Sequence, residues 1–370
     1  MSMDFKIENV LSMNGGQTDS SYARNSCYQE ISLRILQPYL EESIGQMKMV
    51  PCGRFCIADL GCAAGPNTLH VAQIICRAVQ KKYKALGIGM PDLQVFFSDL
   101  PCNDFNLLFQ SLPLSVPPDG RLQACHYFAA GVAGSFHNRL FPRSSLHFIH
   151  SSFSLHWLSR VPPEVENQMS SSWNGDRVYI SKEGRVEVAE AYLRQFQEDL
   201  KSFLRARAEE VVEGGWMFLF FSGRAGACPR QQGGSGAVGD ILELAFKDMV
   251  CEGVIERATR DSFNLPFFSP SALEVRELVE EDGSFLVKKM EFLSMDTEMK
   301  IQSDVDFGRM VAKQFRAILE VLIASYFGEH VVESLFQRFA ERASQNASVL
   351  YNSLRQGGGI LAIIERACTP

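Results

Sequence analysis

Two kinds of apolar pattern alternate along most of the chain. Some apolar residues form continuous runs of strand length, and others recur at every third or fourth position, as on one face of a helix. Glycine, proline and other turn-forming residues bound the continuous runs, which is typical of buried strands. The expected strands are 55–60, 93–100, 123–132, 146–152, 216–223, 284–294 and 358–367.

Helical patterns fill most of the intervals between these strands. Strands that alternate with helices predict an α/β fold, a Rossmann-like doubly wound sheet with helices on both faces. The last two strands are expected to close the sheet as a pair. The clearest helical patterns are one that follows the first strand, 187–212, 309–355 with a break near Gly328, and an early one that carries Gln29.

Some segments exceed what a minimal sheet of this kind needs. The segments 160–186 and 224–282 lie outside the alternation, and we expect them to form a helical cap over the sheet together with part of 309–355. The proline-containing segment 113–118 is not expected to be regular throughout, because proline interrupts both helices and central strands.

Composition and charge exclude several classes of protein. The 370 residues are 46% apolar and 21% charged, which is ordinary for a globular protein and unlike a disordered one. A net charge of -7 has the wrong sign for nucleic acid or an anionic membrane surface, so neither is expected as a partner. The apolar runs are also much shorter than the roughly 20 residues of a membrane helix.

The cysteines and the N-terminus indicate a cytoplasmic protein. The chain has ten cysteines and no C-x-x-C pair, a usage that suits reduced thiols better than a disulfide framework. Asp4, Lys6 and Glu8 lie where a signal peptide would need its apolar stretch.

A small-residue turn follows the first predicted strand. The string D-L-G-C-A-A-G-P-N begins at Asp59, and Gly61 and Gly65 let a ligand approach the backbone closely. The string does not match the G-x-G-x-x-G motif of dinucleotide-binding loops. In such loops the glycines let a pyrophosphate reach the N-terminus of the next helix, whereas here Cys62 and Ala63 fill part of that space. A ligand without phosphates therefore fits this turn better.

A second acidic residue, Asp99, ends the second predicted strand. Ligands of open parallel sheets bind beyond the carboxyl ends of the strands, so Asp99 is at a place where a ligand is expected. A carboxylate at this place can accept both hydroxyl groups of a ribose. A nucleoside without pyrophosphate indicates S-adenosylmethionine as the cofactor.

The turn and the two acidic residues are also compatible with different roles. The turn could be an ordinary strand-to-helix connection, and Asp99 could be a cap. A nicotinamide oxidoreductase would share the sheet, but it should have a pyrophosphate-binding loop. A silent receptor for small acids would keep a pocket, but it would have no need of Asp59, Asn67, Asp99 and Ser135.

Several unusual strings of residues follow one another in order along the chain. They cover nearly the whole chain, which therefore resembles the SABATH methyltransferases of plants. These enzymes methylate salicylate, benzoate, jasmonate, indole-3-acetate, cinnamate and xanthine alkaloids. The strings are S-M-N-G-G (12–16), S-S-Y-A-R-N-S (20–26), A-D-L-G-C-A-A-G-P-N-T (58–68), S-D-L-P-C-N-D-F-N (98–106), G-S-F-H-N-R-L-F-P (134–142), H-F-I-H-S-S-F-S-L-H-W-L-S (147–159), Q-F-Q-E-D-L (195–200), D-S-F-N-L-P (261–266) and F-G-E (327–329).

The resemblance implies a class I methyltransferase core with a mixed sheet, and it implies roles for individual residues. Asp99 would bind the ribose, and Ser135 and Phe136 would surround the adenine. Gln29 and Trp157 would hold the substrate carboxylate, and Phe153 and His156 would line the same pocket. The full cofactor set is Tyr22, Asp59, Cys62, Asn67, Asp99, Leu100, Ser135, Phe136 and Ser152.

The resemblance also implies a metal site, an assembly and a division of the chain. A peripheral magnesium ion, which methyl transfer does not require, would bind at Asn174, Asp261, Phe263 and Asn264. The expected assembly is a homodimer. The expected parts are 1–54 as an N-terminal segment over the active site, 55–160, 187–223 and 284–370 as the cofactor-binding core, and 161–186 and 224–283 as cap and substrate-binding insertions.

The predicted reaction is methyl transfer to the carboxylate of a small aromatic or hormone-type acid, which gives a methyl ester. Relatives that act on carboxylates usually have a lysine where this chain has Asn14, and asparagine also occurs there in xanthine N-methyltransferases. His137 likewise replaces a common tyrosine. The S-L-H-W string that ends at Trp157 is more similar to the indole-3-acetate and cinnamate branch. N-methylation of a xanthine or a related heterocycle is the alternative.

Overall fold

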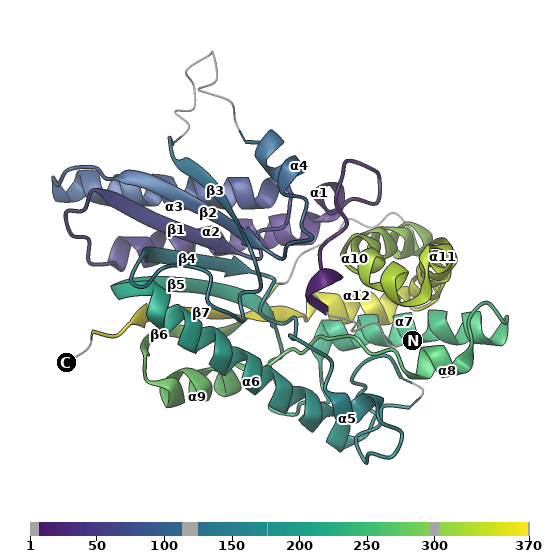
Figure 1. Ribbon diagram of the computed structural model, residues 1–370. Helices are drawn as coiled ribbons and strands as arrows, with labels where there is room; N and C mark the ends of the chain where they lie inside the picture. The colour runs from purple at the N-terminus through teal and green to yellow at the C-terminus, as the bar shows by residue number, and fades with distance from the viewer. Residues whose placement is uncertain (1–6, 113–124, 176, 296–302, 369–370) are drawn as a thin grey trace.

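A seven-stranded mixed sheet forms the centre of the computed structural model, which describes residues 7–112, 125–175, 177–295 and 303–368 (Figure 1). The strand order is β3-β2-β1-β4-β5-β7-β6, with β7 antiparallel to both of its neighbours and the other pairs parallel. The strands are β1 Arg54–Leu60, β2 Asp92–Asp99, β3 Phe128–Ala133, β4 Leu146–Ser152, β5 Val211–Gly223, β6 Phe285–Ser294 and β7 Gly358–Arg366.

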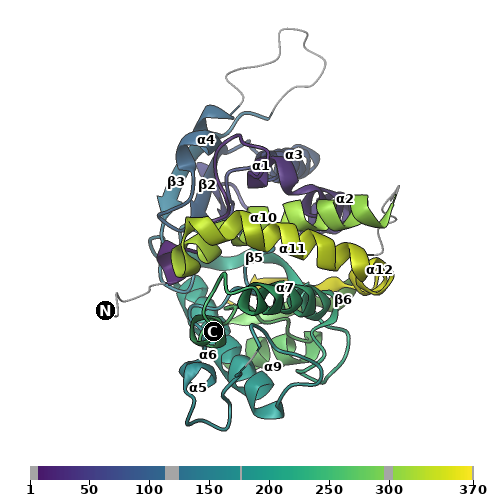
Figure 2. The same ribbon diagram turned by 90° about the vertical axis from the view of Figure 1, so that its right-hand side faces the viewer.

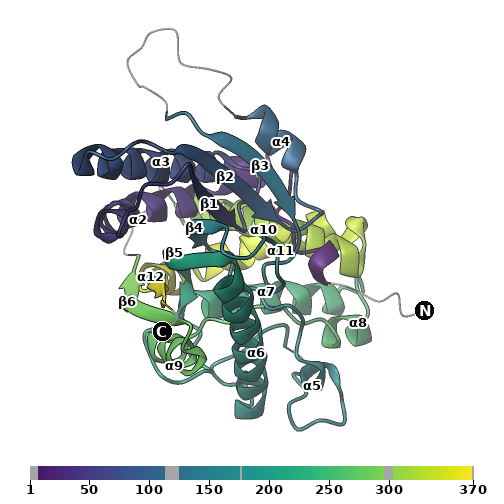
Figure 3. The ribbon, with the colours of Figure 1, turned by 60° about the vertical axis from the view of Figure 1, so that its left-hand side comes forward.

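Helices cover both faces of this sheet, as a doubly wound fold requires (Figure 3). Apolar residues of α2 and α3 pack on one face with alternate residues of the strands, and those of α6 and α9 pack on the other. The central strands are buried on both sides, which explains their continuous apolar runs. These helices are α2 Cys27–Gln46, α3 Pro66–Leu86, α6 Val186–Glu210 and α9 Ala272–Asp282.

A helical cap lies against the carboxyl ends of the parallel strands (Figures 1 and 2). Its helices pack mainly on one another, with α11 between α7 and α10 and α12 against α7. The cap consists of α7 Gly233–Cys251, α8 Arg257–Asp261, α10 Asp304–Phe327, α11 Glu329–Gln345 and α12 Ala347–Arg355. The smaller helices elsewhere are η1 Ile7–Asn9, α1 Tyr22–Asn25, α4 Phe105–Gln110 and α5 Pro163–Glu166.

The segment before α2 joins the cap to the core. The Asn14 backbone N–H donates to the Ala317 carbonyl of α10 (2.9 Å), and the Gly16 N–H donates to Asp104 Oδ2 at the start of α4 (3.0 Å). This segment therefore crosses the edge of the sheet where the first strands end. No helix among the described residues is long and apolar enough to cross a membrane.

The expected α/β fold with a cap is confirmed, and three of its boundaries differ by more than two residues from those expected. β5 starts at Val211 and runs through Gly214 and Gly215, where a break in register with β4 accommodates the glycines. The helical pattern expected at 309–355 begins at Asp304, and it has a second break at Asn346 besides the one at Gly328. β3 begins at Phe128 rather than 123, and 113–124, which includes the proline-containing segment, lies outside the described residues.

A fully buried ion pair at the end of α6 holds a loop that follows β3. The Arg207 guanidinium lies 2.7 Å from Glu210 Oε2 and donates to the carbonyls of Phe136 and Asn138 (both 2.9 Å). Glu210 Oε1 in turn accepts the Phe141 backbone N–H (3.0 Å). The pair therefore satisfies backbone groups of this loop that would otherwise be buried without partners.

We predict that Glu210→Gln destabilises the protein strongly, because it leaves the Arg207 charge buried without its counter-ion. Breaking such a pair costs about 3–5 kcal/mol. The neighbouring Glu209 forms exposed ion pairs with Arg139 and Arg143, so Glu209→Gln should change the free energy of unfolding by less than about 1 kcal/mol. Urea unfolding of both variants measures the difference, and equal effects would contradict this account.

Candidate functional site

Two adjoining cavities lie beyond the carboxyl ends of the parallel strands, and the cap lines one of them. The strand-end cavity, of about 80 Å³, is lined by residues such as Asp99, Ser135 and Ser152. The apolar cavity, of about 180 Å³, lies between the strand ends and helices α2, α7 and α10. The two cavities share four lining residues, Met13, Tyr22, Phe153 and Trp157.

All nine residues of the predicted cofactor set line the strand-end cavity or a smaller cavity beside it. The smaller one, of about 40 Å³, also has Tyr22 and Ser152 in its wall, so the two spaces adjoin. Asp59, Cys62 and Asn67 line the smaller cavity, and Tyr22, Asp99, Leu100, Ser135, Phe136 and Ser152 line the strand-end cavity.

The turn after β1 is shaped by close contacts. Gly61 has a φ of +77°, and a Cβ at this position would lie 2.0 Å from Ser154 Oγ, so only glycine fits. The N–H groups of Gly61 and Cys62 both donate to the Ser98 carbonyl, which ties this turn to β2. Burial raises the pKa of the Cys62 thiol well above its usual value, so the thiol stays protonated.

Asp99 is held by two backbone donors. Its Oδ2 accepts the Ala63 N–H and its Oδ1 accepts the Leu100 N–H, each at 2.7 Å. Burial nevertheless raises the pKa of Asp99 to about 6, against the lowering effect of those two hydrogen bonds. Each oxygen keeps a further lone pair, so the carboxylate can accept two more hydrogen bonds from a ligand.

Asp59 belongs to a chain of buried hydrogen bonds. Its Oδ1 lies 2.7 Å from His150 Nδ1, its Oδ2 accepts the Thr68 hydroxyl (2.5 Å), and His150 Nε2 lies 2.9 Å from Ser152 Oγ. Nδ1 must carry a proton to bind a carboxylate, so in a neutral ring Nε2 accepts the proton of Ser152. Ser152 then presents lone pairs rather than a donor to the cavities that it lines.

The sequence analysis gave His150 no role in the site, so this chain of hydrogen bonds was not expected. His150 is directly opposite Asp59 in the β1–β4 register, and only 3% of its surface is exposed. The available signal was its position two residues before Ser152 on a predicted strand, since both side chains then lie on the same face.

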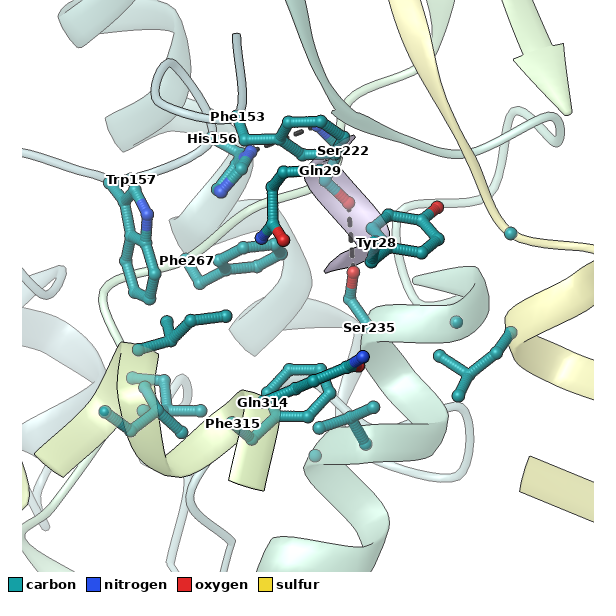
Figure 4. A pocket seen from close by; sticks show the side chains of 18 of the residues that line it. Tyr28, Gln29, Phe153, His156, Trp157, Ser222, Ser235, Phe267, Gln314 and Phe315 are labelled. Carbon is teal, nitrogen blue, oxygen red and sulfur yellow. Dashed lines mark hydrogen bonds between the residues drawn. The ribbon is translucent and has the colours of Figure 1, made fainter. Parts of the chain in front are cut away.

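The apolar cavity contains all four predicted substrate residues (Figure 4). Gln29, His156 and Trp157 project into the same part of the cavity from α2 and the turn after β4. The remaining wall is mostly apolar and aromatic. Its other members include Tyr28, Val238, Leu242, Leu265, Phe267, Phe315, Ile318 and Leu319.

His156 is a neutral hydrogen-bond donor in this wall. Its Nδ1 accepts the Ser222 backbone N–H (3.0 Å), so the proton of the neutral ring is on Nε2. Burial lowers the pKa of His156 to about 3, which keeps the ring uncharged at neutral pH and makes it a poor general base. The ring packs against Phe267, with 4.5 Å between the ring centroids.

Phe153 stands at the junction of the cavities with an unusual backbone conformation. Its φ is +58°, which is rare for a bulky side chain, and its N–H donates to the Phe220 carbonyl on β5 (2.7 Å). The ring packs edge-on against Tyr28 and Phe220. Strained backbone is characteristic of ligand-binding sites, and here it directs an aromatic ring into the passage between two cavities.

Asn14, the residue that left the substrate class open, lines neither cavity. Its side-chain amide donates to the carbonyl and the hydroxyl of Ser20, both at 3.1 Å. The neighbouring Met13 lines both cavities instead. Asn14 therefore shapes the N-terminal segment and makes no contact with the cavity.

The structure brings two of the predicted metal-binding residues together. Asn174 Nδ2 donates to Asn264 Oδ1 (2.7 Å), whereas Asp261 lies 2.8 Å from the Arg260 guanidinium. The Phe263 side chain is buried among other aromatic rings, so only its backbone carbonyl could bind a cation. The part of the chain that is described contains no group of three or more His, Cys, Asp or Glu side chains able to hold a metal ion.

Fold and cavities together define a Rossmann-like α/β protein with a polar strand-end cavity beside an apolar one. A family model for SAM-dependent carboxyl methyltransferases matches residues 8–358. The solved structure of a loganic acid methyltransferase with SAH is similar, with a TM-score of 0.87 and 33% identity over 96% of this chain and 99% of that one.

Curated relatives agree with the family model. Indole-3-acetate O-methyltransferase 1 of Oryza sativa subsp. japonica is 40% identical over 94% of this chain and 91% of the rice protein. A 3,7-dimethylxanthine N-methyltransferase of Camellia sinensis var. assamica is 39% identical over 90% of this chain and 91% of its own length. The chain belongs to the SAM-dependent carboxyl methyltransferases, and the resemblance to the SABATH family is confirmed.

We predict that cofactor affinity depends on the charge of Asp99. Its pKa is raised to about 6, so about half of the Asp99 carboxyl groups are protonated at that pH, and S-adenosylmethionine should bind progressively more weakly as the pH falls through this value. Asp99→Asn should raise the Kd at pH 7.5 by at least about tenfold, since hydrogen bonds to charged groups contribute about 1.5–3 kcal/mol. The variant should also lose this pH dependence.

Calorimetric titration between pH 5 and about pH 8 measures both effects. Asp92, an exposed residue at the other end of β2, provides the control, and Asp92→Asn should bind the cofactor as the wild type does. An unchanged Kd in Asp99→Asn would exclude Asp99 from the cofactor site.

Proposed function

We propose that this methyltransferase acts on the carboxylate of a small aromatic or hormone-type acid, in the class of indole-3-acetate, cinnamate, 4-coumarate, salicylate and benzoate. The observation that carries the proposal is the apolar cavity, which has a group of neutral N–H donors beside its junction with the strand-end cavity. The indole-3-acetate O-methyltransferases among the relatives support the same class of substrate.

The strand-end and smaller cavities would hold S-adenosylmethionine. Asp99 would accept the ribose hydroxyls, Ser135 and Phe136 would contact the adenine, and Tyr22, Asn67 and Ser152 would surround the amino-acid end. Their position along the carboxyl ends of β1, β2 and β4 is where nucleosides bind in sheets of this kind. When bound, the cofactor supplies a methyl group on a sulfonium, which is already an activated electrophile.

The protein then has to orient the substrate rather than activate it. A carboxylic acid has a pKa near 4 and is therefore ionised at neutral pH, so no general base is needed. The Gln29 amide, the Trp157 indole N–H and the His156 Nε2–H would donate hydrogen bonds to the acid. The aromatic wall would hold the ring and exclude water, so catalysis would come from proximity and desolvation.

The alternative is N-methylation of a xanthine or a related heterocycle, which a Camellia relative performs according to its name. Asn14 gives no support to this alternative, because its amide is bonded to Ser20 outside the cavity. The carboxylate proposal therefore rests on the donor group and on the family.

A magnesium ion at Asn174, Asp261, Phe263 and Asn264 also stays a prediction. Amide, carboxylate and carbonyl oxygens are the ligands that Mg²⁺ prefers, although Asp261 is engaged by Arg260. Phe263 and Asn264 line a separate cavity of about 520 Å³, so the ion would be peripheral to the reaction. The homodimer, the cytoplasmic location and the division into core and cap segments likewise stay predictions.

We predict that purified protein transfers a labelled methyl group from S-adenosylmethionine to at least one aromatic acid, because the donor group suits a carboxylate. The measurement is a panel that contains indole-3-acetate, cinnamate, 4-coumarate, salicylate, benzoate, jasmonate, gibberellin and xanthosine derivatives, with methyl esters identified by mass spectrometry. Methylation of a xanthine compound and of no acid would overturn the proposal.

We predict that Trp157→Phe lowers kcat/KM for the acid by roughly 10- to 100-fold, since an aromatic ring and most of its packing are kept but a donor to a charged group is lost. The melting temperature should change little. Trp173, which lines none of the four cavities, offers the matched control, and Trp173→Phe should retain the wild-type kcat/KM. Full activity of Trp157→Phe would show that the carboxylate is held elsewhere.

A further inference from the structure

Three serine hydroxyls form a triangle in one wall of the apolar cavity. Ser222 Oγ lies 3.0 Å from both Ser235 Oγ and Ser269 Oγ, and Ser269 Oγ lies 3.3 Å from Ser235 Oγ. The residues come from the end of β5, the first turn of α7 and the segment between α8 and α9. Figure 4 shows the bond between Ser222 and Ser235 at the edge of the cavity.

Surrounding hydrogen bonds fix this serine triangle in place. The Ser269 N–H donates to Gln232 Oε1 (2.8 Å), and its carbonyl accepts from the buried Arg224 guanidinium (2.5 Å). The Ser222 N–H is bound to His156 Nδ1. A polar group that is held this firmly costs little further entropy when it binds a ligand.

The triangle adjoins His156 through the Ser222 backbone and lies in the apolar cavity. Ser222 and Ser235 line the apolar cavity but not the strand-end cavity, whereas Phe153 and Trp157 line both. Ser269 is fully buried behind the other two. A substrate whose carboxylate is held at the junction would place its ring system in the apolar cavity, where Ser222 and Ser235 form part of the wall.

The hydroxyls in the triangle can satisfy one another. If each one donates to the next, all three protons are used within the triangle, and each oxygen keeps lone pairs. Ser222 and Ser235 are half-buried and offer those lone pairs to the cavity. The neighbouring Val238 and Phe267 offer no hydrogen-bond partner, and the other polar side chains of this wall include Tyr28 and Gln314.

We infer that the serine triangle is a second recognition subsite, which accepts a hydrogen bond from a donor on the ring end of the acid. A phenolic hydroxyl or a ring N–H has the required chemistry. This inference rests on the proposed function and deepens it: the substrate would be an aromatic acid with a donor remote from its carboxylate, as in 4-hydroxycinnamate or an indole acid, rather than an unsubstituted acid.

Matched pairs of acids test the subsite. 4-Coumarate and cinnamate differ by one hydroxyl, and indole-3-acetate and 1-benzothiophene-3-acetate differ by the N–H. We predict that the wild-type enzyme has a higher kcat/KM for the donor-bearing acid of at least one pair. Ser235→Ala should reduce this ratio about five- to tenfold, because it removes an acceptor and breaks the triangle.

Val238→Ala is the control variant. Val238 lies one turn further along α7 in the same cavity wall, so its truncation changes the cavity volume without removing a polar group. It should affect both acids of a pair alike. Unfolding midpoints of both variants, measured by circular dichroism, show whether the fold is intact, and Ser222→Ala provides an independent variant of the same triangle.

The outcomes separate the two proposals. A ratio that falls in Ser235→Ala or Ser222→Ala but not in Val238→Ala supports the subsite. If acids are methylated but the ratio is the same in the serine variants and the wild type, the subsite is wrong and the proposed function stands. If the wild-type enzyme methylates no acid, the proposed function itself is overturned.

Discussion

The contact between Asp59 and His150 organises the cofactor side of this enzyme. The two residues face each other at the carboxyl ends of β1 and β4, and both are almost completely buried. A buried carboxylate needs partners, and Asp59 has them in His150 and in Thr68 at the start of α3. One contact thereby connects two strands and a helix, and it sets the direction in which Ser152 offers its lone pairs.

The second constraint is the junction between the strand-end and apolar cavities. Tyr22, Phe153 and Trp157 line both cavities, so side chains that would contact the cofactor would also contact the substrate. The backbone of Phe153 has a positive φ at this place, and its N–H is bonded to β5. Rigid aromatic side chains at such a junction suit a reaction in which alignment of two molecules is the main requirement.

The sequence predicted the sheet well because its strands are buried on both faces and read as continuous apolar runs. It predicted β4 to the residue, but it missed the start of β5, where two glycines resemble a turn. In the structure, a Cβ on Gly215 would lie 2.7 Å from Val211 Cγ1, so the glycine allows the strand to fold closely on itself. Packing of Val238 and Leu242 similarly overrides the glycine-rich start of α7.

Positions of candidate site residues could be expected where they follow strand ends, because parallel strands bring their carboxyl ends to one edge. The serine triangle could not be expected, because its members come from three distant segments and meet only through the packing of the cap. The tautomer and low pKa of His156 are equally invisible in the sequence, since both result from burial and from one backbone N–H.

A cavity with neutral donors suits methyl transfer to a carboxylate for a physical reason. An anion and a sulfonium combine to give an uncharged ester and an uncharged thioether, so charge disappears as the reaction proceeds. A lysine beside the carboxylate would stabilise the charged reactant more than the transition state, and it would be left as a buried charge beside a neutral ester. Neutral N–H groups from Gln29, His156 and Trp157 would orient the same oxygen atoms and leave no unpaired charge behind. The absence of a cation from the lining of the apolar cavity, among the residues that the structure describes, is therefore compatible with a carboxylate substrate.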